Sequence, residues 1–418
     1  MSASIDADWL QDSDLQRLLA ALSRDGEEAR IAGGAVRDTL LGRDVSDVDI
    51  ATTTLPDETM RRAEAAGFGA IPTGIEHGTV TVAAGKKTYE VTTLRADIET
   101  DGRHAKVQFG RDWKADAERR DFTINALYAD RDGTVVDLVG GVADLEARNL
   151  RFIGDPELRI REDYLRILRF FRFFAWYGAG RPDAEGLKAC ARLKDGLDRL
   201  SAERVWAELK KLLAAPDPSR ALLWMRQAGV LTRVLPESEK WGIDAIHALV
   251  AAERDLGWTP DALLRLAAIV PPDPARMTAL AERMKMSTAE ALRLSRWAQA
   301  DAPKWDADEA DFGKLLYRGD RQAIDDRIRL ALVSARAQAV ENDAALVEAG
   351  GFSRLLNIAA GWKAPAFPLK GGDLVTLGAR TGPEVGKLLR NLRDEWVESG
   401  FELDRGALLE RAAHRLKN

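Results

Sequence analysis

Hydrophobic and polar positions alternate most clearly between residues 45 and 51, where Val45, Asp47 and Asp49 fall on one face of a predicted strand. A short apolar strand is expected just before, at 29–32, followed by a Gly33–Gly34 turn and a short helix that Gly42 ends. The pattern therefore predicts strand, turn, helix and strand in succession. It also places two carboxylates two positions apart, an arrangement suited to holding a divalent cation beside substrate phosphates.

Strand-type patterns continue through the first 150 residues and then stop. We expect strands within 68–95 and at 135–138, a hairpin turn at 85–87, a long loop or loose hairpin at 97–114, and helices at 1–28, 57–66 and 118–128. Beyond residue 150 the patterns are helical, beginning with a long amphipathic helix at 159–177 and continuing with helices at about 184–195, 202–214 and 219–228. In the last segment, Gly382 is the expected N-cap of a helix that starts at Pro383. The predicted fold class is α+β: a small head with a mixed β-sheet and helices, followed by an all-helical remainder.

Composition sets limits on the class of protein. The 418 residues are 46% hydrophobic and 31% charged, as in soluble globular proteins, and no apolar run approaches the ~18 residues that span a bilayer. The acidic start lacks the pattern of a secretory signal, so we expect a cytoplasmic protein with no membrane partner. Cys190 is the single cysteine, which excludes an internal disulfide and a cysteine-based zinc site. The net charge of −6 does not by itself indicate nucleic-acid binding.

Glu90 lies on the second strand of the predicted hairpin. If this strand runs beside the one that carries Asp47 and Asp49, Glu90 supplies a third carboxylate. The alternative is an exposed charge on an edge strand.

Groups that bind phosphate are predicted around the glycine turn. Gly34 offers a backbone N–H at the start of a helix, and Arg37 and Arg120 offer planar forks that can pair two phosphate oxygens. For Arg37 the alternative is an ion pair with Asp38 or Asp44. For Arg120 it is a surface charge cluster with its neighbours.

Asp163 and Arg166 are three residues apart and are therefore expected on one face of the 159–177 helix. The carboxylate can accept the exocyclic amino proton of cytosine or adenine, and the guanidinium can donate to the adjacent ring nitrogen. Guanine and uracil present the reverse pattern and would leave polar groups unpaired. Arg169 and Arg172 continue along the helix toward the base, the triphosphate or the underlying helix. An ordinary salt-bridged helix is the alternative.

The stretch GG-x-V-R-D followed by D-x-D at 33–49 resembles the signature of DNA polymerase beta-like nucleotidyltransferases. RRDFTINAL, EDYLRILRFFRF, SAERVWAELKKLL and LKGGDL with GPEVGKLL resemble, in order, motifs of the class II CCA-adding tRNA nucleotidyltransferases. The resemblance implies a catalytic head (1–150), a nucleotide-selecting neck (151–215), a body (216–350) and a tail that contacts tRNA (351–418). It implies Mg²⁺ as cofactor, ATP and CTP as substrates, and the tRNA 3′ end and acceptor arm as partner. Carried over residue by residue, it implies that Asp47 and Asp49 hold metal, that Glu90 is a further catalytic carboxylate, and that nucleotide contacts come from Gly34, Arg37, Arg120, Asp163, Arg166, Arg169 and Arg172.

Within that family, bacterial poly(A) polymerases are one alternative, although residues 73–79, TGIEHGT, resemble the CCA-adding branch. CC-adding enzymes are another; they lack a flexible loop that here, at 97–114, has its full length. An inactive RNA-binding protein would be expected to lose one of the aspartates. A small-molecule nucleotidyltransferase would need neither the 163/166 pair nor a long helical tail.

Overall fold

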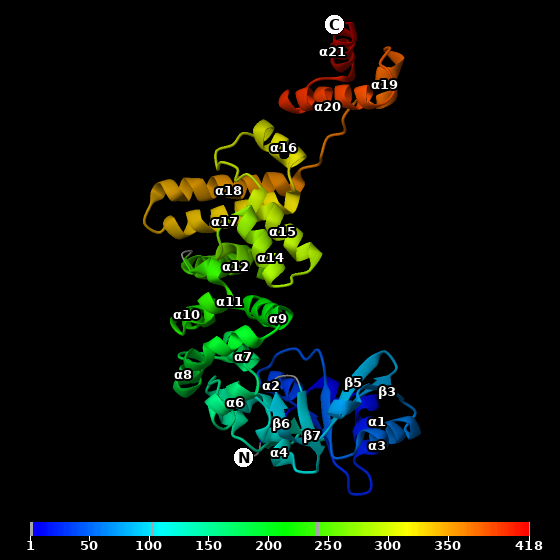
Figure 1. Ribbon diagram of the computed structural model, residues 1–418, viewed down its shortest axis with the longest axis vertical. Helices are drawn as coiled ribbons and strands as arrows, with labels where there is room; N and C mark the ends of the chain where they lie inside the picture. Colours follow the sequence, from blue (N-terminus) through cyan, green and yellow to red (C-terminus); the bar gives the residue numbers. More distant parts are fainter. Residues whose placement is uncertain (1–2, 102–103, 240–241, 418) are drawn as a thin grey trace. The chain divides into compact units, whose positions relative to one another are not determined.

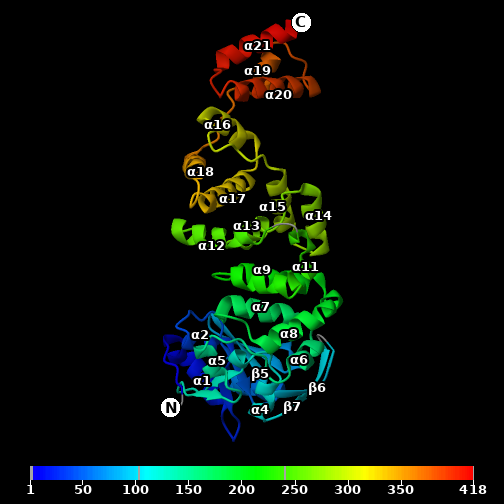
Figure 2. The ribbon, with the colours of Figure 1, turned by 90° about the vertical axis from the view of Figure 1, so that its left-hand side faces the viewer.

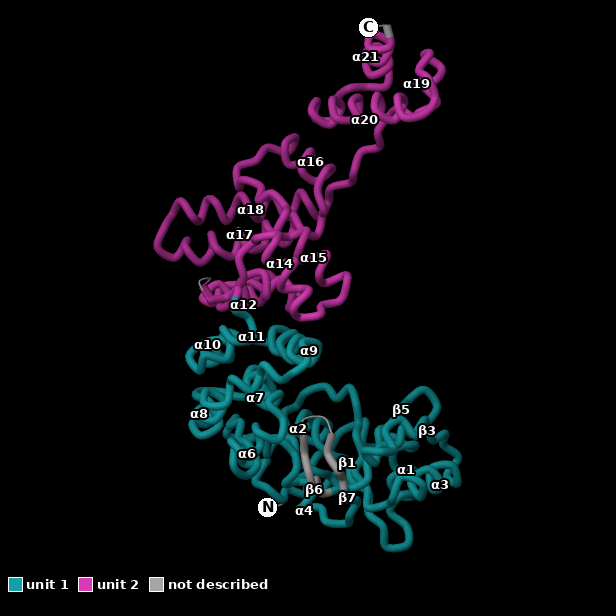
Figure 3. The backbone as a smooth tube through the Cα atoms, viewed as in Figure 1, with its two compact units in different colours: residues 1–236 teal, residues 237–418 magenta. Residues whose placement is uncertain are grey.

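The computed structural model describes residues 3–101, 104–239 and 242–417, without the side chains of 96–107 and 417. The chain forms two compact units, residues 1–236 and 237–418 (Figure 3). None of the helices in the described ranges combines the length and apolar character that a membrane crossing requires. The helix expected at 1–28 and the helical stretch expected beyond residue 150 include undescribed residues, as does the loop or hairpin expected at 97–114.

The first unit is built on a seven-stranded mixed sheet (Figure 1). Its strand order is β3-β4-β5-β2-β1-β8-β9, and β2 and β5 pair in parallel while the other recorded neighbours pair antiparallel. The strands are β1 (Ala29–Ala32), β2 (Asp49–Thr52), β3 (Gly69–Gly74), β4 (Thr79–Ala84), β5 (Lys87–Thr93), β8 (Leu127–Ala129) and β9 (Val135–Asp137). The predicted mixed sheet is confirmed.

A separate two-stranded hairpin, β6 (Arg95–Asp101) and β7 (His104–Phe109), accounts for most of the stretch expected as a loop or loose hairpin. The helices of the head are α1 (Ser13–Leu22), α2 (Gly34–Leu40), α3 (Pro56–Ala65), α4 (Trp113–Glu118) and α5 (Gly141–Glu146), with 3-10 turns η1 (Asp8–Gln11), η2 (Ile75–His77) and η3 (Thr123–Asn125).

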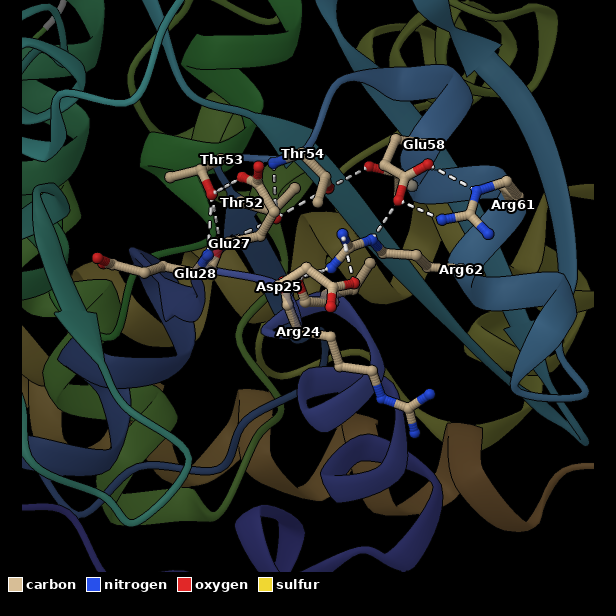
Figure 4. Close-up of polar contacts among 12 residues, drawn as sticks. Arg24, Asp25, Glu27, Glu28, Thr52, Thr53, Thr54, Glu58, Arg61 and Arg62 are labelled. Atoms are coloured by element: carbon tan, nitrogen blue, oxygen red, sulfur yellow. Dashed lines mark hydrogen bonds and ion pairs between the residues drawn. The ribbon is translucent and has the colours of Figure 1, made fainter.

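Buried hydroxyl groups anchor β2 at its carboxyl end. The Thr52 hydroxyl donates to the Glu28 carbonyl over 3.0 Å, and the Thr54 hydroxyl lies 3.0 Å from that of Thr52 and 2.7 Å from that of Thr59 on α3. Figure 4 shows this network beside Glu58 and Arg62 of α3. Because the hydroxyls satisfy one another away from water, they fix the strand that begins at Asp49.

The first unit continues as helices: α6 (Pro156–Glu162), α7 (Leu165–Tyr177), α8 (Ala184–Leu193), η4 (Lys194–Arg199), α9 (Ala202–Leu213), α10 (Ser219–Gln227) and α11 (Val230–Val234). Helix α7 buries one apolar face, which includes Ile167, Leu168 and Phe171, and α9 lies along it in both ribbon views (Figures 1 and 2). The predicted helices near 184–195, 202–214 and 219–228 are confirmed.

The second unit consists of helices with cores of their own. One cluster joins α16, α17 and α18 around Ile328 and Leu355, and another joins α19, α20 and α21 around Leu392 and Trp396. Its elements are η5 (Pro236–Ser238) at the unit boundary, then α12 (Asp244–Leu256), α13 (Ala262–Ala268), α14 (Pro274–Arg283), α15 (Thr288–Gln299), α16 (Glu309–Arg318), α17 (Arg321–Gln338), α18 (Asp343–Gly361), α19 (Gly371–Thr376), α20 (Pro383–Glu398) and α21 (Arg405–Lys417). Gly382 is the N-cap of α20, and Pro383 is its first residue, as predicted.

Four predicted elements are wrong in part or in whole. The strand expected at 45–51 begins only at Asp49, so Asp47 lies in the preceding coil. The helix expected at 118–128 is instead a turn, the 3-10 turn η3 and the strand β8. Residues 127–129 are buried throughout, and a short, fully apolar run does not distinguish a central strand from a buried helix.

The long helix expected at 159–177 is divided into α6 and α7 by Asp163, whose backbone is extended (φ −153°, ψ 108°). Asp163 and Arg166 therefore do not share one helix, which removes the spacing argument that paired them. At the amino terminus, the single helix expected at 1–28 is a 3-10 turn followed by the shorter α1.

Candidate active site

A cavity of about 460 Å³ in the first unit joins the sheet of the head to the first helices that follow it. The glycine turn, the start of β2, the α6–α7 break and α9 all contribute to its lining. Its lining residues are Gly33, Gly34, Arg37, Asp49, Arg119, Arg120, Asp121, Asn125, Asp163, Leu165, Arg166, Arg169, Phe173 and Arg204. The cavity thus brings together seven predicted site residues that are spread over more than a hundred positions of the sequence.

Asp49 and Glu90 face each other across the parallel pair β2–β5, where they are register partners. Asp49 is exposed at the start of β2, yet the groups around its carboxyl partly desolvate it and raise its pKa above the usual range; the charges of Glu90 and Asp47 raise that pKa further, against the opposing effect of Arg120. Asp47 is exposed and accepts a hydrogen bond from the Ser46 hydroxyl over 2.8 Å. Three neighbouring carboxylates provide the hard oxygen donors that Mg²⁺ prefers. Among the described residues, however, no three acidic, histidine or cysteine side chains close into a preformed metal cluster.

The backbone of the glycine turn lies close to the segment that carries Arg120 and Asn125. Gly33 has a positive φ of 68°, and a Cβ there would lie 3.4 Å from both Arg120 Nη1 and the Asn125 carbonyl. Gly34 begins α2 directly beside it. A residue with a side chain at position 33 would be strained and would narrow the cavity.

Arg37 is buried, and most of its donors are engaged. Its guanidinium bonds both oxygens of Asp38 at 3.0 and 2.9 Å, donates to the Tyr177 hydroxyl at 2.7 Å, and also bonds Asn125 Oδ1. The ion pair with Asp38 that the sequence left open is therefore present. Arg37 borders the cavity while joining α2 to α7.

Arg119 and Arg120 converge on one buried carboxylate, Asp116. Arg120 Nη2 lies 3.1 Å from Asp116 Oδ2, which also accepts the Tyr128 hydroxyl proton over 2.7 Å, and Arg119 Nε donates to Oδ1 over 2.8 Å. Burial alone would raise the pKa of Asp116, but the charges of Arg120 and Arg119 outweigh it and hold that pKa below its usual range. This carboxylate orients both arginines at the cavity wall.

Asp163 and Arg166 both reach the cavity from the α6–α7 break. Asp163 Oδ2 accepts a hydrogen bond from Arg204 Nη2 at 2.6 Å, and Oδ1 accepts the Leu165 N–H at 3.1 Å. Arg166 Nη1 donates to the Arg159 carbonyl at 2.7 Å and pairs with Glu162. Although they do not share a helix, the turn brings both groups to the same cavity.

Arg169 and Arg172 separate. Arg169 lines the cavity and pairs with Asp121, whose other oxygen accepts the Asn125 amide proton at 3.0 Å. Arg172 is not among the lining residues; its Nε donates to Glu208 of α9 over 2.6 Å. For Arg172, the structure therefore shows the alternative, a salt bridge between helices.

Sequence reasoning missed four cavity or neighbouring groups: Asp121, Asn125, Glu162 and Arg204. Asp121 and Asn125 lie in the segment wrongly assigned to a helix. Glu162 and Arg204 lie within the EDYLRILRFFRF and SAERVWAELKKLL motifs, but their contribution depends on ion pairs that no local spacing reveals.

Two family models match the chain. Residues 29–151 match the poly A polymerase head domain, and residues 181–241 match a domain described as a probable RNA and SrmB-binding site of polymerase A.

Full-length relatives and a solved structure match almost the whole chain. The mitochondrial CCA tRNA nucleotidyltransferase 1 of Mus musculus is 34% identical over 408 residues, covering 94% of this chain and 88% of the relative. The CCA-adding enzyme of Levilactobacillus brevis is 31% identical over 402 residues, covering 94% and 95%. The crystal structure of the Bacillus stearothermophilus CCA-adding enzyme in complex with CTP superimposes with a TM-score of 0.76 at 26% identity, covering 99% of this chain and 100% of that one.

Proposed function

This chain belongs to the CCA tRNA nucleotidyltransferase family, and we propose that it adds C, C and A to the 3′ end of tRNA from CTP and ATP without a nucleic-acid template. The protein is an enzyme of the nucleotidyltransferase class. One observation carries the proposal: a single cavity is lined both by Asp49, at the start of β2, and by Asp163 and Arg166 of the α6–α7 break. The first suits metal-assisted transfer, and the second suits recognition of a base.

Mg²⁺ is the proposed cofactor, with Asp47 and Asp49 as its ligands and Glu90 as the neighbouring carboxylate. The donor set fits a hard cation because Asp49 and Glu90 are register partners on neighbouring strands and Asp47 lies two residues before Asp49, so all three offer carboxylate oxygens. When bound, two such ions would activate the attacking hydroxyl and stabilise the negative charge of the leaving pyrophosphate.

Contacts to the triphosphate are proposed for Gly34, Arg120 and Arg169. Gly34 offers its backbone N–H, while the guanidinium groups of Arg120 and Arg169 border the cavity and are oriented by Asp116 and Asp121. Arg37 and Arg172 were also expected to contact nucleotide. We propose that Arg37 reaches it at the cavity edge, and that Arg172 acts mainly by tying α7 to α9.

Selection of C and A is proposed for Asp163 and Arg166. The carboxylate accepts the amino proton of either base, and the guanidinium donates to its ring nitrogen. U and G would set acceptor against acceptor and donor against donor, at a cost of roughly 1–3 kcal/mol for each unpaired buried group.

The test uses tRNA that lacks its terminal CCA, with sequencing of the product ends. The wild type should add CCA, whereas Asp49→Asn should lose at least about a hundredfold in rate while retaining tRNA binding, because electrostatic stabilisation at the reacting centre is removed. Asp163→Ala should admit UTP or GTP. Repeated A would indicate a poly(A) polymerase, CC ends a CC-adding enzyme, and bound tRNA without addition an inactive RNA-binding protein.

The division into head, neck, body and tail at residues 150, 215 and 350 is also a proposal, as is the role of the tail in contacting tRNA. Cytoplasmic location is proposed too, although the named mouse relative is mitochondrial. Cell fractionation with an antibody against the chain tests that location directly.

A further inference from the structure

A cavity of about 450 Å³ lies within the second unit, among α12, α13, α15 and α17 (Figure 2). Its volume falls in the range of about 300–1,000 Å³ that small-molecule sites occupy. Buried lining residues include Ala268, Trp297 and Val333, whereas Ala337 and Gln338 of the lining are exposed. The cavity therefore extends from the apolar core of this unit to its surface.

Two side chains of this lining carry a buried nitrogen donor without an acceptor. Trp297 Nε1 and Arg327 Nε have no hydrogen-bond partner among the residues that the structure describes. Trp297 is only 2% exposed, so its indole N–H is well inside the unit. A buried indole usually finds a hydrogen-bond partner, because a donor left unpaired away from water costs free energy. A ligand with an acceptor group would satisfy these donors.

Arg327 also brings a positive charge to the cavity. Its guanidinium forms no ion pair with an acidic side chain in the described part of the chain, and Asp301 acts on it only through its charge. Partial burial lowers the pKa of Arg327, although a guanidinium stays protonated in proteins. A partly buried cation without an ion-pair partner favours an anionic ligand.

The lining also limits the kind of anion. One guanidinium compensates one negative charge, and Asp244, an exposed lining residue, disfavours a second. A carboxylate carries a single charge and offers two oxygens, which can accept from an indole and a guanidinium together. The apolar lining favours a ligand whose other atoms are hydrocarbon or aromatic. These features fit a monocarboxylate better than a phosphate.

We propose that this cavity binds a small monocarboxylate with an apolar body, whose carboxylate accepts hydrogen bonds from Arg327 and Trp297. All the lining residues belong to the second unit, whereas the candidate active site belongs to the first. The inference therefore goes beyond the proposed function and does not depend on it.

Isothermal titration calorimetry of the full chain at pH 8 measures the affinity, with octanoate as the probe. Octanoate should bind at a single site with a dissociation constant below about 1 mM, as expected for a ligand of its size in a preformed pocket. Octan-1-ol lacks the charge and should bind at least about tenfold more weakly. Octyl phosphate carries nearly two negative charges at this pH and should also bind more weakly, because the second charge has no partner.

Two arginine variants on α17 test the role of the guanidinium. Arg327→Met should weaken octanoate binding by about tenfold or more, the scale of one hydrogen bond to a charged group, with little effect on octan-1-ol. Arg336→Met is the matched control, because Arg336 lies on the same helix but is exposed and does not line the cavity. It should leave the affinity for octanoate within about twofold of the wild type.

Indole N–H resonances report whether the ligand reaches the cavity. In protein labelled with 15N-tryptophan, Trp297→Phe removes one resonance and so assigns it to Trp297. Octanoate should shift this resonance in the wild type, and the shift should saturate with the dissociation constant that calorimetry gives. The same shift is expected in Arg336→Met.

An affinity for octanoate that does not exceed that for octan-1-ol or octyl phosphate overturns the inference. So does a Trp297 resonance that stays in place at saturating octanoate, or a folded Arg327→Met protein with unchanged affinity. If Arg327→Met does not fold, the ligand comparison and the Trp297 resonance in the wild type decide the question. Addition of C and A to tRNA is measured separately, so failure of the proposed function is distinguishable from failure of this inference.

Discussion

Asp116 shows how one buried carboxylate can organise a cationic wall. Its side chain is 1% exposed and holds Arg119, Arg120 and the Tyr128 hydroxyl. Asp116→Asn would leave two arginines facing an uncharged group, and breaking a buried ion pair from one side costs about 3 kcal/mol or more. We expect the first unit to unfold several degrees lower at pH 7. Glu118→Gln, on the exposed face of the same helix, is the control and should change stability by less than about 0.5 kcal/mol.

The effect of Asp116→Asn should depend on pH. The folded-state pKa of Asp116 is held below its usual value, so its stabilising effect is complete above the unfolded pKa of about 3.9 and is lost as pH falls through the folded pKa. Thermal unfolding at pH 7, 5 and 3.5 should therefore show a full difference between wild type and variant at the first two values and a smaller one at the third. A difference that is constant with pH would mean that the ion pairs do not carry the effect.

Cys190 is fully enclosed in α8, and burial raises the pKa of its thiol well above the usual range. Both the scarcity of thiolate and the lack of access should make it inert in the folded enzyme. A thiol reagent at pH 8 should label the native protein at least about a hundredfold more slowly than the protein in guanidinium chloride, because labelling needs an opening reaction. Fast labelling without denaturant would contradict the packing of α8.

At the scale of elements, adjacent glycines in α18 face opposite environments. A Cβ on Gly350 would meet nothing within 4 Å, whereas one on Gly351 would lie 2.4 Å from the Trp305 carbonyl oxygen. Gly350→Ala should stabilise the second unit by about 0.5–1 kcal/mol, because alanine loses less entropy in a helix. Gly351→Ala should destabilise it by about 1–3 kcal/mol through overpacking. Thermal unfolding of the two variants measures both signs, and equal shifts would refute the placement of Trp305.

The elements that sequence could predict were those with a local cause. The glycine turn at 33–34, the N-cap at Gly382 and the hairpin around Gly85 follow from backbone freedom and alternation, and the structure has all three. The break at Asp163 has no such signal, because the apolar periodicity continues through 159–177. A tertiary contact from Arg204 satisfies the Asp163 side chain where the helix ends, together with the local Leu165 N–H. The cavity partners Asp121 and Glu162 were missed for the same reason.

At the scale of the whole molecule, the two compact units are expected to unfold separately. Each unit has buried cores of its own, around Tyr128 in the first and around Ile328 and Leu392 in the second. Domains with separate cores can unfold in separate steps. We expect calorimetry to show two transitions, with Asp116→Asn lowering one and Gly351→Ala lowering the other. Thiol labelling of Cys190 identifies the first unit, because the single cysteine should become reactive only with the transition that Asp116→Asn moves. One shared transition, lowered alike by both variants, would instead show that the units unfold together.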